Sequence, residues 1–299
     1  MHRGAIVRIL VTGASGLCAS AIARKLVAGG HEVHASYRSK APELPTGMAF
    51  HGTYQGSLAE RKTFSAFPKQ IDAVVHAAAA LNDPATPVRK FVEDNVIATH
   101  NVIDYALAAG ARKFVYLSSV SVSGKVSQSR YDEATPIVDP DPYGYTKRLG
   151  ELLLNDARDR LASVSLRLPG IIGDGGFPNW LMDLARRLAA GGKVSIHHPD
   201  HRFNNAVHVD DLADFCAGYL SRDHDGAHLL TLGASEPMTV RDIVETLAEG
   251  LGSTSEIDIV ESDQEPFAID DSAARDKFDY RSKTMEKIID FLISLHKKN

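Results

Sequence analysis

Short runs of β-forming apolar residues alternate with longer helical patterns through the first half of the chain. Buried strands are predicted at residues 6–11, 32–37, 73–78, 113–118 and 164–168. Helical spacing of apolar positions predicts helices at residues 19–28, 95–109 and 143 to about 161. Repeated alternation of strand and helix is typical of a parallel sheet covered on both faces. We therefore predict an α/β fold with a doubly wound parallel sheet, the Rossmann fold.

The pattern changes after residue 168. Helices are predicted at 180–190 and 208–220, and from Thr239 to about residue 250, whereas 191–205 looks irregular. A closing helix places one apolar stripe at Met285, Ile288, Ile289, Leu292 and Leu295. We predict that residues 1–168, joined by about 203–232, form a dinucleotide-binding domain. Residues 169–202 and 233–299 are expected to form a smaller C-terminal α/β substrate lobe.

Composition narrows the function classes. Hydrophobic residues make up 44% of the 299 residues, and the net charge of −5 is spread along the chain, which disfavours a nucleic-acid surface. No apolar run reaches the ~20 residues of a membrane span. The start of the chain resembles a buried strand more than an export signal. With only two cysteines, Cys18 and Cys216, we expect free thiols and a cytoplasmic protein.

A glycine-rich turn follows the first predicted strand and opens a helix. Gly13 permits a tight turn, Gly16 lets the backbone approach a pyrophosphate, and Ala19 is small enough for helix and strand to pack. The free N–H groups of the helix N-terminus attract phosphate. The turn predicts a dinucleotide site, although glycines after a strand also occur in ordinary turns.

The end of the second strand bears on the choice of cofactor. Arg38 and Lys40 stand where an acidic residue would bind the adenosine 2′-hydroxyl and repel a 2′-phosphate. A guanidinium binds phosphate with two hydrogen bonds. We therefore predict NADP, with NAD as the alternative; the competing interpretation is that both cations only decorate a surface loop.

Three residues form a candidate catalytic group. Tyr143 and Lys147 are four residues apart and share one helix face, and Ser119 follows a strand at the sheet edge where ligands bind. Carbonyl reduction needs a hydride on carbon and a proton on oxygen. A nearby ammonium and an oxidised nicotinamide ring both favour the phenolate of a tyrosine, so Lys147 and the ring together are expected to lower the pKa of Tyr143. Ser119 would bind the substrate oxygen, and Lys147 would also hold the nicotinamide ribose.

These motifs, in this order, resemble the extended short-chain dehydrogenase/reductase family, which includes nucleotide-sugar epimerases, dehydratases and reductases. Residues 12–19 match its TGxxGxxG motif with Ala19 at the last glycine, and 117–124 match its SSxxVYG motif with Ser123 at the tyrosine. Further similarity lies at 74–78, 95–101, 167–170 and 207–213. The resemblance implies cofactor contacts from Gly13, Ser15, Gly16, Leu17, Arg38, Ser57, Leu58, Ala77, Ala78, Ala79, Asn95, Lys147, Pro169 and Ile171.

Departures from the family pattern concern the substrate. Ser57 replaces the family's usual aspartate at the adenine, and Ser121 belongs to a Val-Ser pair where 4,6-dehydratases have Asp-Glu. Asn204 occupies the position of an arginine that grips the diphosphate in epimerases, and Arg202 lies two residues earlier. Neither cysteine fits the catalytic pair of 3,5-epimerases. The candidate substrate residues are Ser121, Asn179, Arg202 and Asn204.

The resemblance implies an enzyme that moves a hydride to or from a sugar carbon, as a 4-ketoreductase or 4-epimerase of a nucleotide sugar. A reductase of a non-sugar ketone and a non-catalytic NADP-binding sensor are the alternatives. The histidines at 197, 198, 201 and 208 match no zinc-binding spacing, so we predict no metal. Glu133 is either a substrate contact or a solvated loop acid, and Trp180 and Phe177 are expected to pack the smaller lobe. A homodimer is expected by analogy with relatives.

Overall fold

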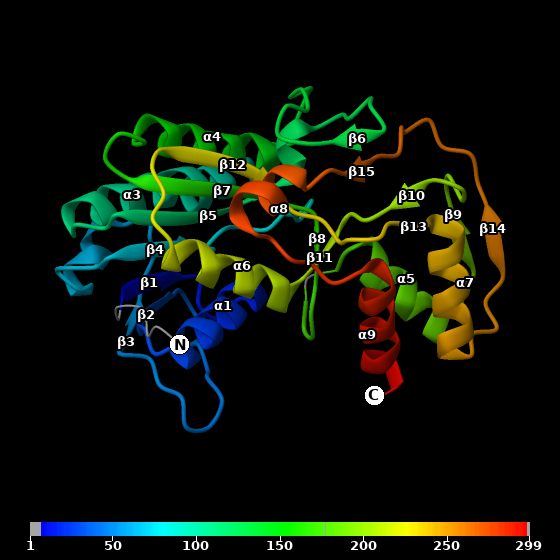
Figure 1. Cartoon of the computed structure of the whole chain (residues 1–299), viewed down its shortest axis with the longest axis horizontal. Helices are drawn as coiled ribbons and strands as arrows, with labels where there is room; N and C mark the ends of the chain where they lie inside the picture. The colour runs from blue at the N-terminus through cyan, green and yellow to red at the C-terminus, as the bar shows by residue number, and fades with distance from the viewer. Residues whose placement is uncertain (1–6, 177, 298–299) are drawn as a thin grey trace. The chain divides into compact units, whose positions relative to one another are not determined.

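The computed structural model describes residues 7–176 and 178–297, and its elements are labelled in Figure 1. Contacts between residues divide the chain into two compact units. The first unit contains Met1–Gly124, Asp139–Arg167 and Leu212–Leu230, and the second contains Lys125–Val138, Leu168–Asp211 and Thr231–Asn299. The expected domain boundaries differ from this division at 125–138, 168, 203–211 and 231–232, which all belong to the second unit.

A seven-stranded sheet forms the centre of the first unit and confirms the predicted fold class. Its strand order is β12-β7-β5-β4-β1-β2-β3, and the neighbours from β5 to β3 run parallel. The strands are β1 (Arg8–Thr12), β2 (Glu32–Tyr37), β3 (Gly52–Gln55), β4 (Ala73–His76), β5 (Lys113–Ser119), β7 (Ala162–Leu168) and β12 (Ala227–Thr231). The order reverses at β1, which lies between β2 and β4, and ligands of such sheets bind beside this point.

Burial of the central strands explains why helices cover both faces. All four residues of β4 are buried, as are four of the five in β1, so neither face can remain in water. In Figure 1, α1 (Leu17–Ala28) and α6 (Val209–Ser221) lie on one side of the sheet, and α3 (Ala98–Ala108) and α4 (Pro142–Asp156) lie on the other. Lys25 of α1 forms an ion pair with Asp214 of α6 at 2.5 Å.

Several predicted boundaries shift. Ile6 of the first predicted strand lies outside the described residues, and β1 extends to Thr12. The helix predicted at 95–109 begins earlier, as α2 (Val88–Phe91) and a π-helical turn (Val92–Ile97) that leads into α3. The helix predicted to reach residue 161 ends at Asp156, because the chain turns there to enter β7, where the Ala162 N–H donates to the Arg112 carbonyl at 3.1 Å.

In the second unit, three helices share one apolar core. They are α5 (Trp180–Ala189), α7 (Val240–Leu251) and α9 (Met285–Lys297). Their buried side chains include Leu184, Leu188, Ile243, Leu247, Ile288 and Leu292. The closing stripe is buried as predicted from Met285 to Leu292, and Leu295 is only half-buried. A shorter helix, α8 (Ser272–Phe278), precedes α9.

Short strand pairs complete the second unit. They are β6 (Arg130–Tyr131) with β15 (Ala268–Ile269), β8 (Gly170–Ile172) with β11 (Ala206–His208), β9 (Val194–Ile196) with β14 (Ile257–Ile259), and β10 (Arg202–Phe203) with β13 (Met238–Thr239). The stretch 191–205 is therefore not irregular throughout, because it contains β9 and β10. Strands of two or three residues are too short to show a period of two in the sequence.

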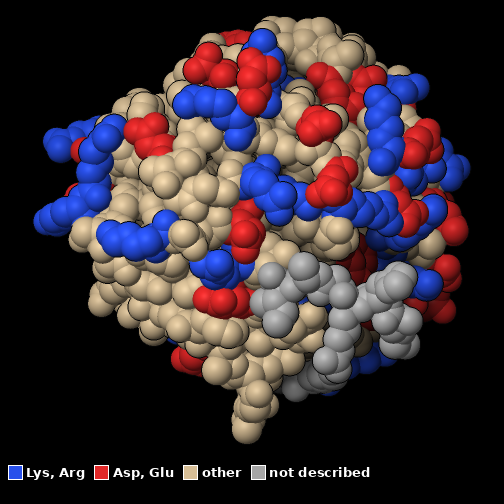
Figure 2. All heavy atoms as spheres, turned by 60° about the vertical axis from the view of Figure 1, so that its left-hand side comes forward, with Lys and Arg blue, Asp and Glu red and all other residues tan. Residues whose placement is uncertain are grey.

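The distribution of charged side chains and the length of the helices both agree with the expectations drawn from composition. Figure 2 shows Lys and Arg side chains interspersed with Asp and Glu over much of one face. Within the described residues, no helix is long and apolar enough to cross a membrane.

Two glycines set the distance between α4 and the sheet. A Cβ atom on Gly144 would lie 2.2 Å from the Ser121 carbonyl oxygen, and one on Gly150 would lie 2.4 Å from the Tyr116 hydroxyl. Real Cβ atoms do not come so close to other heavy atoms, so any side chain at these positions would push α4 away from β5. The packing therefore requires glycine at both.

We expect Gly144→Ala to lower the free energy of unfolding by about 1–3 kcal/mol, because the new methyl group meets backbone that cannot move aside. Gly218→Ala in α6 is the matched control. Nothing lies within 4 Å of a Cβ there, so it should be neutral or stabilise by up to about 1 kcal/mol. Urea unfolding measures both, and equal effects would contradict the close approach.

Candidate active site

The glycine-rich turn connects β1 to α1 and forms a cradle of bare backbone. Gly13 has φ +65°, and a Cβ atom on it would lie 2.8 Å from the Ala78 Cα atom. The Gly16 N–H donates to the Gly13 carbonyl at 2.9 Å. No side chain caps the N-terminus of α1, and no acidic residue lies in its first turn. The first N–H groups of α1 are therefore available to an anion such as a pyrophosphate.

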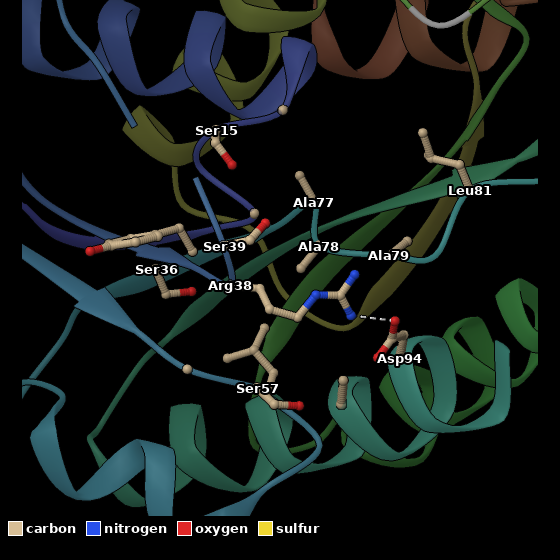
Figure 3. A pocket seen from close by; sticks show the side chains of 16 residues that line it. Ser15, Ser36, Arg38, Ser39, Ser57, Ala77, Ala78, Ala79, Leu81 and Asp94 are labelled. Atoms are coloured by element: carbon tan, nitrogen blue, oxygen red, sulfur yellow. Dashed lines mark hydrogen bonds and ion pairs between the residues drawn. The ribbon is translucent and has the colours of Figure 1, made fainter. Parts of the chain in front are cut away.

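A cavity of about 250 Å³ opens beside this turn (Figure 3). It is lined by nine of the predicted cofactor residues, namely Gly13, Ser15, Gly16, Arg38, Ser57, Leu58, Ala77, Ala78 and Ala79. Leu17, Asn95 and Lys147 are in the same unit but do not line it, and Pro169 and Ile171 belong to the second unit.

The cavity fits the adenosine half of a dinucleotide. Ser36, at the end of β2, is 2% exposed, and its Oγ has no hydrogen-bond partner. Ser39 and Ser57 add two further hydroxyl groups to the lining. A buried hydroxyl without a partner is costly unless a ligand or water completes it. The bare glycine turn offers backbone N–H groups to a phosphate, and the Ser36 hydroxyl offers a hydrogen bond to a ribose.

Arg38 does not extend freely into this cavity. Its Nη1 lies 2.5 Å from Oδ2 of Asp94, which lies in the π-helical turn and also lines the cavity. Lys90 Nζ lies 2.6 Å from the same oxygen. Sequence analysis missed Asp94 because 56 residues separate it from Arg38 and no motif joins them. Lys40 is exposed and is not among the lining residues.

A buried polar chain holds the loop after β4. Thr12 Oγ1 and His76 Nδ1 are hydrogen-bonded at 2.7 Å, and His76 Nε2 and Thr99 Oγ1 at 2.9 Å. Burial, with a smaller contribution from Lys147, lowers the pKa of His76 to about 3, so the ring is neutral at physiological pH. Thr12 Oγ1 also accepts from the N–H groups of Ala77 and Ala78 at 3.2 Å. The cavity wall at 77–78 is thus fixed by β1.

Asn95 continues this chain to α4 and is 1% exposed. Its Oδ1 accepts from the Ala80 N–H at 2.7 Å, and its Nδ2 donates to the Ala80 carbonyl at 3.2 Å and to Thr146 Oγ1 at 3.1 Å. Thr146 Oγ1 donates to the carbonyl of Tyr143 at 2.8 Å. Asn95, which was predicted to contact the cofactor, therefore connects the loop after β4 to α4 by hydrogen bonds in this structure.

The predicted catalytic residues lie where β5 ends and α4 begins. Lys147 is 3% exposed, and its Nζ donates to the Leu117 carbonyl at 2.7 Å. The same Nζ lies 5.8 Å from the ring centroid of Tyr143. Ser119 Oγ accepts from the Ser121 N–H and donates to Ser121 Oγ, both at 3.1 Å. The structure therefore brings the three residues into one region of the first unit.

The electrostatics of this group differ from the expectation. Burial raises the pKa of Tyr143 to about 12; the Asp141 carboxylate adds to the rise, and a hydrogen bond with Ser119 only partly offsets it. Burial also lowers the pKa of Lys147 to about 8. In the chain by itself the Lys147 ammonium does not draw the pKa of this phenol toward neutrality, because desolvation dominates. Tyr143 is a phenol at neutral pH.

An ion pair that sequence analysis missed anchors α4 on its buried side. Glu151 accepts from Arg167 of β7 through both oxygens, at 3.0 Å each, and from Ser118 at 2.7 Å. The Arg167 and Glu151 side chains are 2% and 3% exposed. At the other end, the Asp141 side chain caps α4 by accepting from the Gly144 N–H at 2.6 Å. Both contacts fix the helix that carries Tyr143 and Lys147.

The predicted substrate residues of the second unit make structural hydrogen bonds. Asn204 is 3% exposed; its Nδ2 donates to the Ala234 and Ile269 carbonyls, and its Oδ1 accepts from the Ile269 N–H at 2.7 Å. Asn179 caps α5 and donates to the Ile171 carbonyl at 3.0 Å. Arg202 donates to the Pro237 carbonyl. Ser121, in the first unit, contacts Ser119 as described above.

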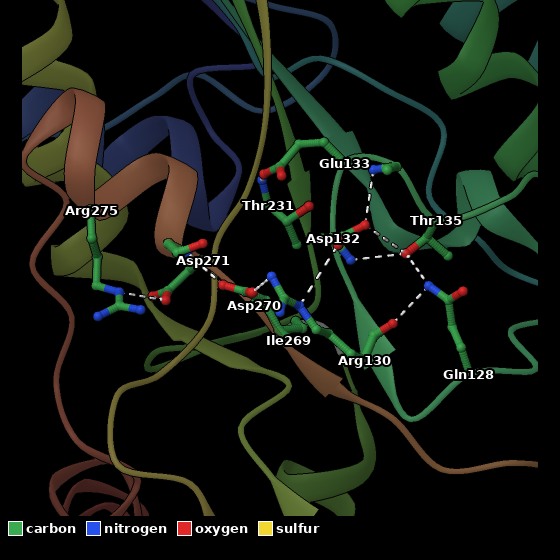
Figure 4. Close-up of polar contacts among 12 residues, drawn as sticks. Gln128, Arg130, Asp132, Glu133, Thr135, Thr231, Ile269, Asp270, Asp271 and Arg275 are labelled. Atoms are coloured by element: carbon green, nitrogen blue, oxygen red, sulfur yellow. Dashed lines mark hydrogen bonds and ion pairs between the residues drawn. The ribbon is translucent and has the colours of Figure 1, made fainter.

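Segment 125–138 is held within the second unit by polar contacts (Figure 4). Arg130 forms an ion pair with Asp270, next to the pairing of β6 with β15. Glu133 Oε1 accepts from the Thr231 N–H at 2.7 Å. Glu133 is therefore not merely a solvated loop acid, because its carboxylate binds the backbone of Thr231.

A second cavity, also of about 250 Å³, lies within the second unit. Aromatic rings and histidines dominate its lining, and Nε2 of both His198 and His201 is buried without a partner. Trp180 packs on Phe203 with ring centroids 4.7 Å apart; Phe177 lies outside the described residues. No lysine or arginine is among the residues that line the cavity. In the described part of the chain, no group of three or more potential ligands could hold a metal ion.

Comparison with known proteins decides the family. A sequence profile of the NAD-dependent epimerase/dehydratase family matches residues 9–232. The chain belongs to this family. It is accordingly an enzyme that depends on a nicotinamide dinucleotide, and the predicted resemblance to the extended short-chain dehydrogenase/reductase group is confirmed.

Two related proteins resemble this chain over most of its length. The UDP-glucose 4-epimerase of Neisseria meningitidis serogroup A is 27% identical over 281 residues, covering 82% of this chain and 83% of the epimerase. The 2-alkyl-3-oxoalkanoate reductase of Stenotrophomonas maltophilia is 31% identical over 268 residues, covering 83% and 76%.

Solved structures share the fold. MoeE5 in complex with UDP-glucose and NAD superposes with a TM-score of 0.80 at 24% identity, covering 97% of this chain and 99% of that one. Bordetella bronchiseptica WbmG in complex with NAD gives 0.83 at 20% identity, covering 100% and 96%. At these identities the likeness establishes the fold alone.

The lowered pKa of Lys147 predicts a pH-dependent stability. The folded pKa of about 8 lies below the ordinary value of 10.5, so the unfolded chain binds more protons between these values. Stability contributed by this group is therefore lowest below pH 8 and rises toward pH 10.5. From pH 7.5 to 9.5, the wild type should gain about 1–2 kcal/mol in unfolding free energy relative to Lys147→Met. Urea unfolding at both pH values measures this, and a constant difference would contradict it.

Proposed function

We propose that the chain transfers a hydride between a nicotinamide dinucleotide and a carbon that is a ketone in one state and a secondary alcohol in the other. Ser119, Tyr143 and Lys147 are the proposed catalytic residues. The observation that carries the proposal is the position of α4, which places Tyr143 and Lys147 at the end of β5 with Lys147 Nζ 5.8 Å from the Tyr143 ring. The glycine cradle and the cavity beside it lie in the same unit.

Each residue has a distinct task. The bound dinucleotide supplies or accepts the hydride. Tyr143, protonated at neutral pH, donates its phenolic proton to the substrate oxygen during reduction. Ser119 binds that oxygen with its hydroxyl group and stabilises the charge that develops on it. Lys147, charged below about pH 8, favours the phenolate that remains and would hold the nicotinamide ribose.

NADP stays the predicted cofactor on the strength of Arg38 and Lys40, with NAD as the alternative. Relatives in solved structures bind NAD. The guanidinium that would bind a 2′-phosphate already has a carboxylate partner in Asp94. Binding of NADP through Arg38 therefore requires this ion pair to open or to tolerate the phosphate.

For the substrate we propose a nucleotide sugar, acted on at C4 by reduction or epimerisation. The support is the match to UDP-glucose 4-epimerases over 82% of the chain. Three observations favour a second candidate, a non-sugar ketone. Asn204, in place of a diphosphate-binding arginine, is buried and fully engaged with backbone. No lysine or arginine lines the second-unit cavity, and a relative at 31% identity is a reductase of 3-oxoalkanoates.

We further propose a cytoplasmic homodimer. Tyr145, Leu149 and Leu152 on α4 are 52%, 45% and 45% exposed, and together they form an apolar strip on the helix face opposite the sheet. Both cysteines are free thiols, in line with a reducing compartment. Sedimentation velocity tests the dimer, and a monomer at micromolar concentration would exclude it.

Tyr143→Phe tests the catalytic proposal and separates it from a cofactor sensor. Loss of the phenolic proton donor should lower turnover by about 10²–10⁴-fold, the usual contribution of a general acid. Dinucleotide affinity, measured by calorimetry, should stay within about twofold, because the hydroxyl group is outside the adenosine cavity. Full turnover in the variant would overturn the role of Tyr143. A wild type that binds dinucleotide but turns over no ketone or alcohol would favour the sensor.

The two substrate candidates are separated by a direct comparison. Wild-type protein is mixed with UDP-glucose or UDP-galactose in the presence of oxidised dinucleotide, which accepts the hydride from C4. It is mixed separately with UDP-4-keto sugars or a 3-oxoalkanoate ester in the presence of reduced dinucleotide. A nucleotide-sugar enzyme should oxidise cofactor with the keto sugars or interconvert the two hexoses. Turnover of the oxo ester alone would replace this proposal with the non-sugar ketone, and turnover of neither class would reject both.

A further inference from the structure

We propose that Asp94 controls the choice between dinucleotides with and without a 2′-phosphate, by holding the guanidinium of Arg38. The proposal rests on the proposed function only in assuming that the first-unit cavity binds a dinucleotide. It assigns a specificity-determining role to a residue of the helical segment before α3, far in sequence from the strand end that meets the ribose.

Arg38 and Asp94 both line the cavity but belong to different segments of the chain, and their charged groups meet inside it. Figure 3 shows the Arg38 side chain reaching across from the end of β2 to Asp94. The backbone of Arg38 is fixed as well, because Gln55 Nε2 of β3 donates to its carbonyl at 3.2 Å. The side chain of Arg38 is 54% exposed, whereas that of Asp94 is 13% exposed. Asp94 is thus the anchored partner and Arg38 the movable one.

Asp94 is ionised under physiological conditions. Burial by itself would raise the pKa of this carboxyl, but hydrogen bonds and charges from Lys90 and Arg38 outweigh burial and lower it below its ordinary value. Lys90 Nζ, four residues earlier on the same helical segment, lies 2.6 Å from the oxygen that contacts Arg38. The cavity wall therefore carries a permanent negative charge that two cations share.

This arrangement treats the two cofactors differently. In dinucleotide-binding folds, the residue after the second strand meets the adenosine ribose, and an arginine there can bind a 2′-phosphate. A phosphate that reaches Arg38 has to displace the Asp94 carboxylate or remain close to it, and like charges repel. A 2′-hydroxyl meets no such repulsion, and the buried, unpartnered Ser36 Oγ lines the same cavity.

Asp94→Asn is the direct test. It keeps the size of the side chain but removes its charge, which frees Arg38 and ends the repulsion. The ratio Kd(NADP)/Kd(NAD), measured by calorimetry for both oxidised cofactors, should fall about tenfold, the effect of one unit charge several ångströms from a phosphate near the protein surface. Glu93→Gln is the matched control. Glu93 pairs with Arg89 on the same segment and does not line the cavity, so the ratio should not change.

Two further variants test whether Asp94 changes the ratio of the two dissociation constants through Arg38. In an Arg38→Ala background, Asp94→Asn should lower the ratio clearly less than tenfold, because the repulsion still ends but no guanidinium is left to release; a full tenfold fall there would show that Asp94 does not act through Arg38 and would overturn the proposal. Lys90→Gln removes a counter-charge from Asp94, so the ratio should rise. This variant also carries the test if Asp94→Asn fails to fold, and an unchanged or lower ratio would contradict the proposal.

The outcomes separate this inference from the proposed function. A wild type that binds neither dinucleotide would overturn both. Binding of both cofactors with the same ratio in wild type, Asp94→Asn and Glu93→Gln would overturn the role of Asp94 and leave hydride transfer standing. A ratio that falls only in Asp94→Asn supports the inference, whichever cofactor the wild type prefers.

Discussion

The close contact between α4 and β5 is the constraint on which the candidate active site depends. Gly144 and Gly150 let the helix lie directly on the Ser121 carbonyl and the Tyr116 ring. Only at this distance does Lys147 reach the Leu117 carbonyl at 2.7 Å. A buried ammonium without an acceptor would be strongly unfavourable, so the two glycines and this hydrogen bond depend on each other. Tyr143 takes its position one turn earlier on the same rigid helix.

Buried polar contacts on both sides of α4 make this position unique. Glu151 joins the helix to β7 and β5, and Asn95 joins its first turns to the loop after β4. Breaking one partner of such a buried pair costs several times more than the pair gains, so these contacts select a single arrangement. The loop held by Asn95 continues into the wall of the adenosine cavity. The candidate cofactor cradle and the helix that carries the candidate catalytic residues are thus parts of one connected structure.

Much of the fold could be predicted from local sequence. Strand β2 begins and ends where expected, and the glycine turn and the shared face of Tyr143 and Lys147 follow from spacing of a few residues. Such features depend on neighbours in sequence, and the periodicity of apolar residues records them.

The features that escaped prediction depend on contacts between distant residues. The ion pair of Arg38 with Asp94 joins positions 56 residues apart. The three hydrogen bonds of Asn204 reach residues up to 65 positions away. Asn95 was assigned to the cofactor because its motif is shared with a family, yet its amide is used by the protein itself. The rise in the pKa of Tyr143 in the chain by itself could not be predicted, because a sequence shows which charges are near but not how completely water is excluded.

The division of the chain has a practical consequence. The backbone passes from one unit to the other five times, after residues 124, 138, 167, 211 and 230. No single cut therefore releases either unit as a continuous fragment. Contributions of the two units to binding have to be separated by point substitutions rather than by expressing fragments. Insertions of extra sequence are likewise best tolerated away from these five crossings, in exposed loops such as the one around Gly47.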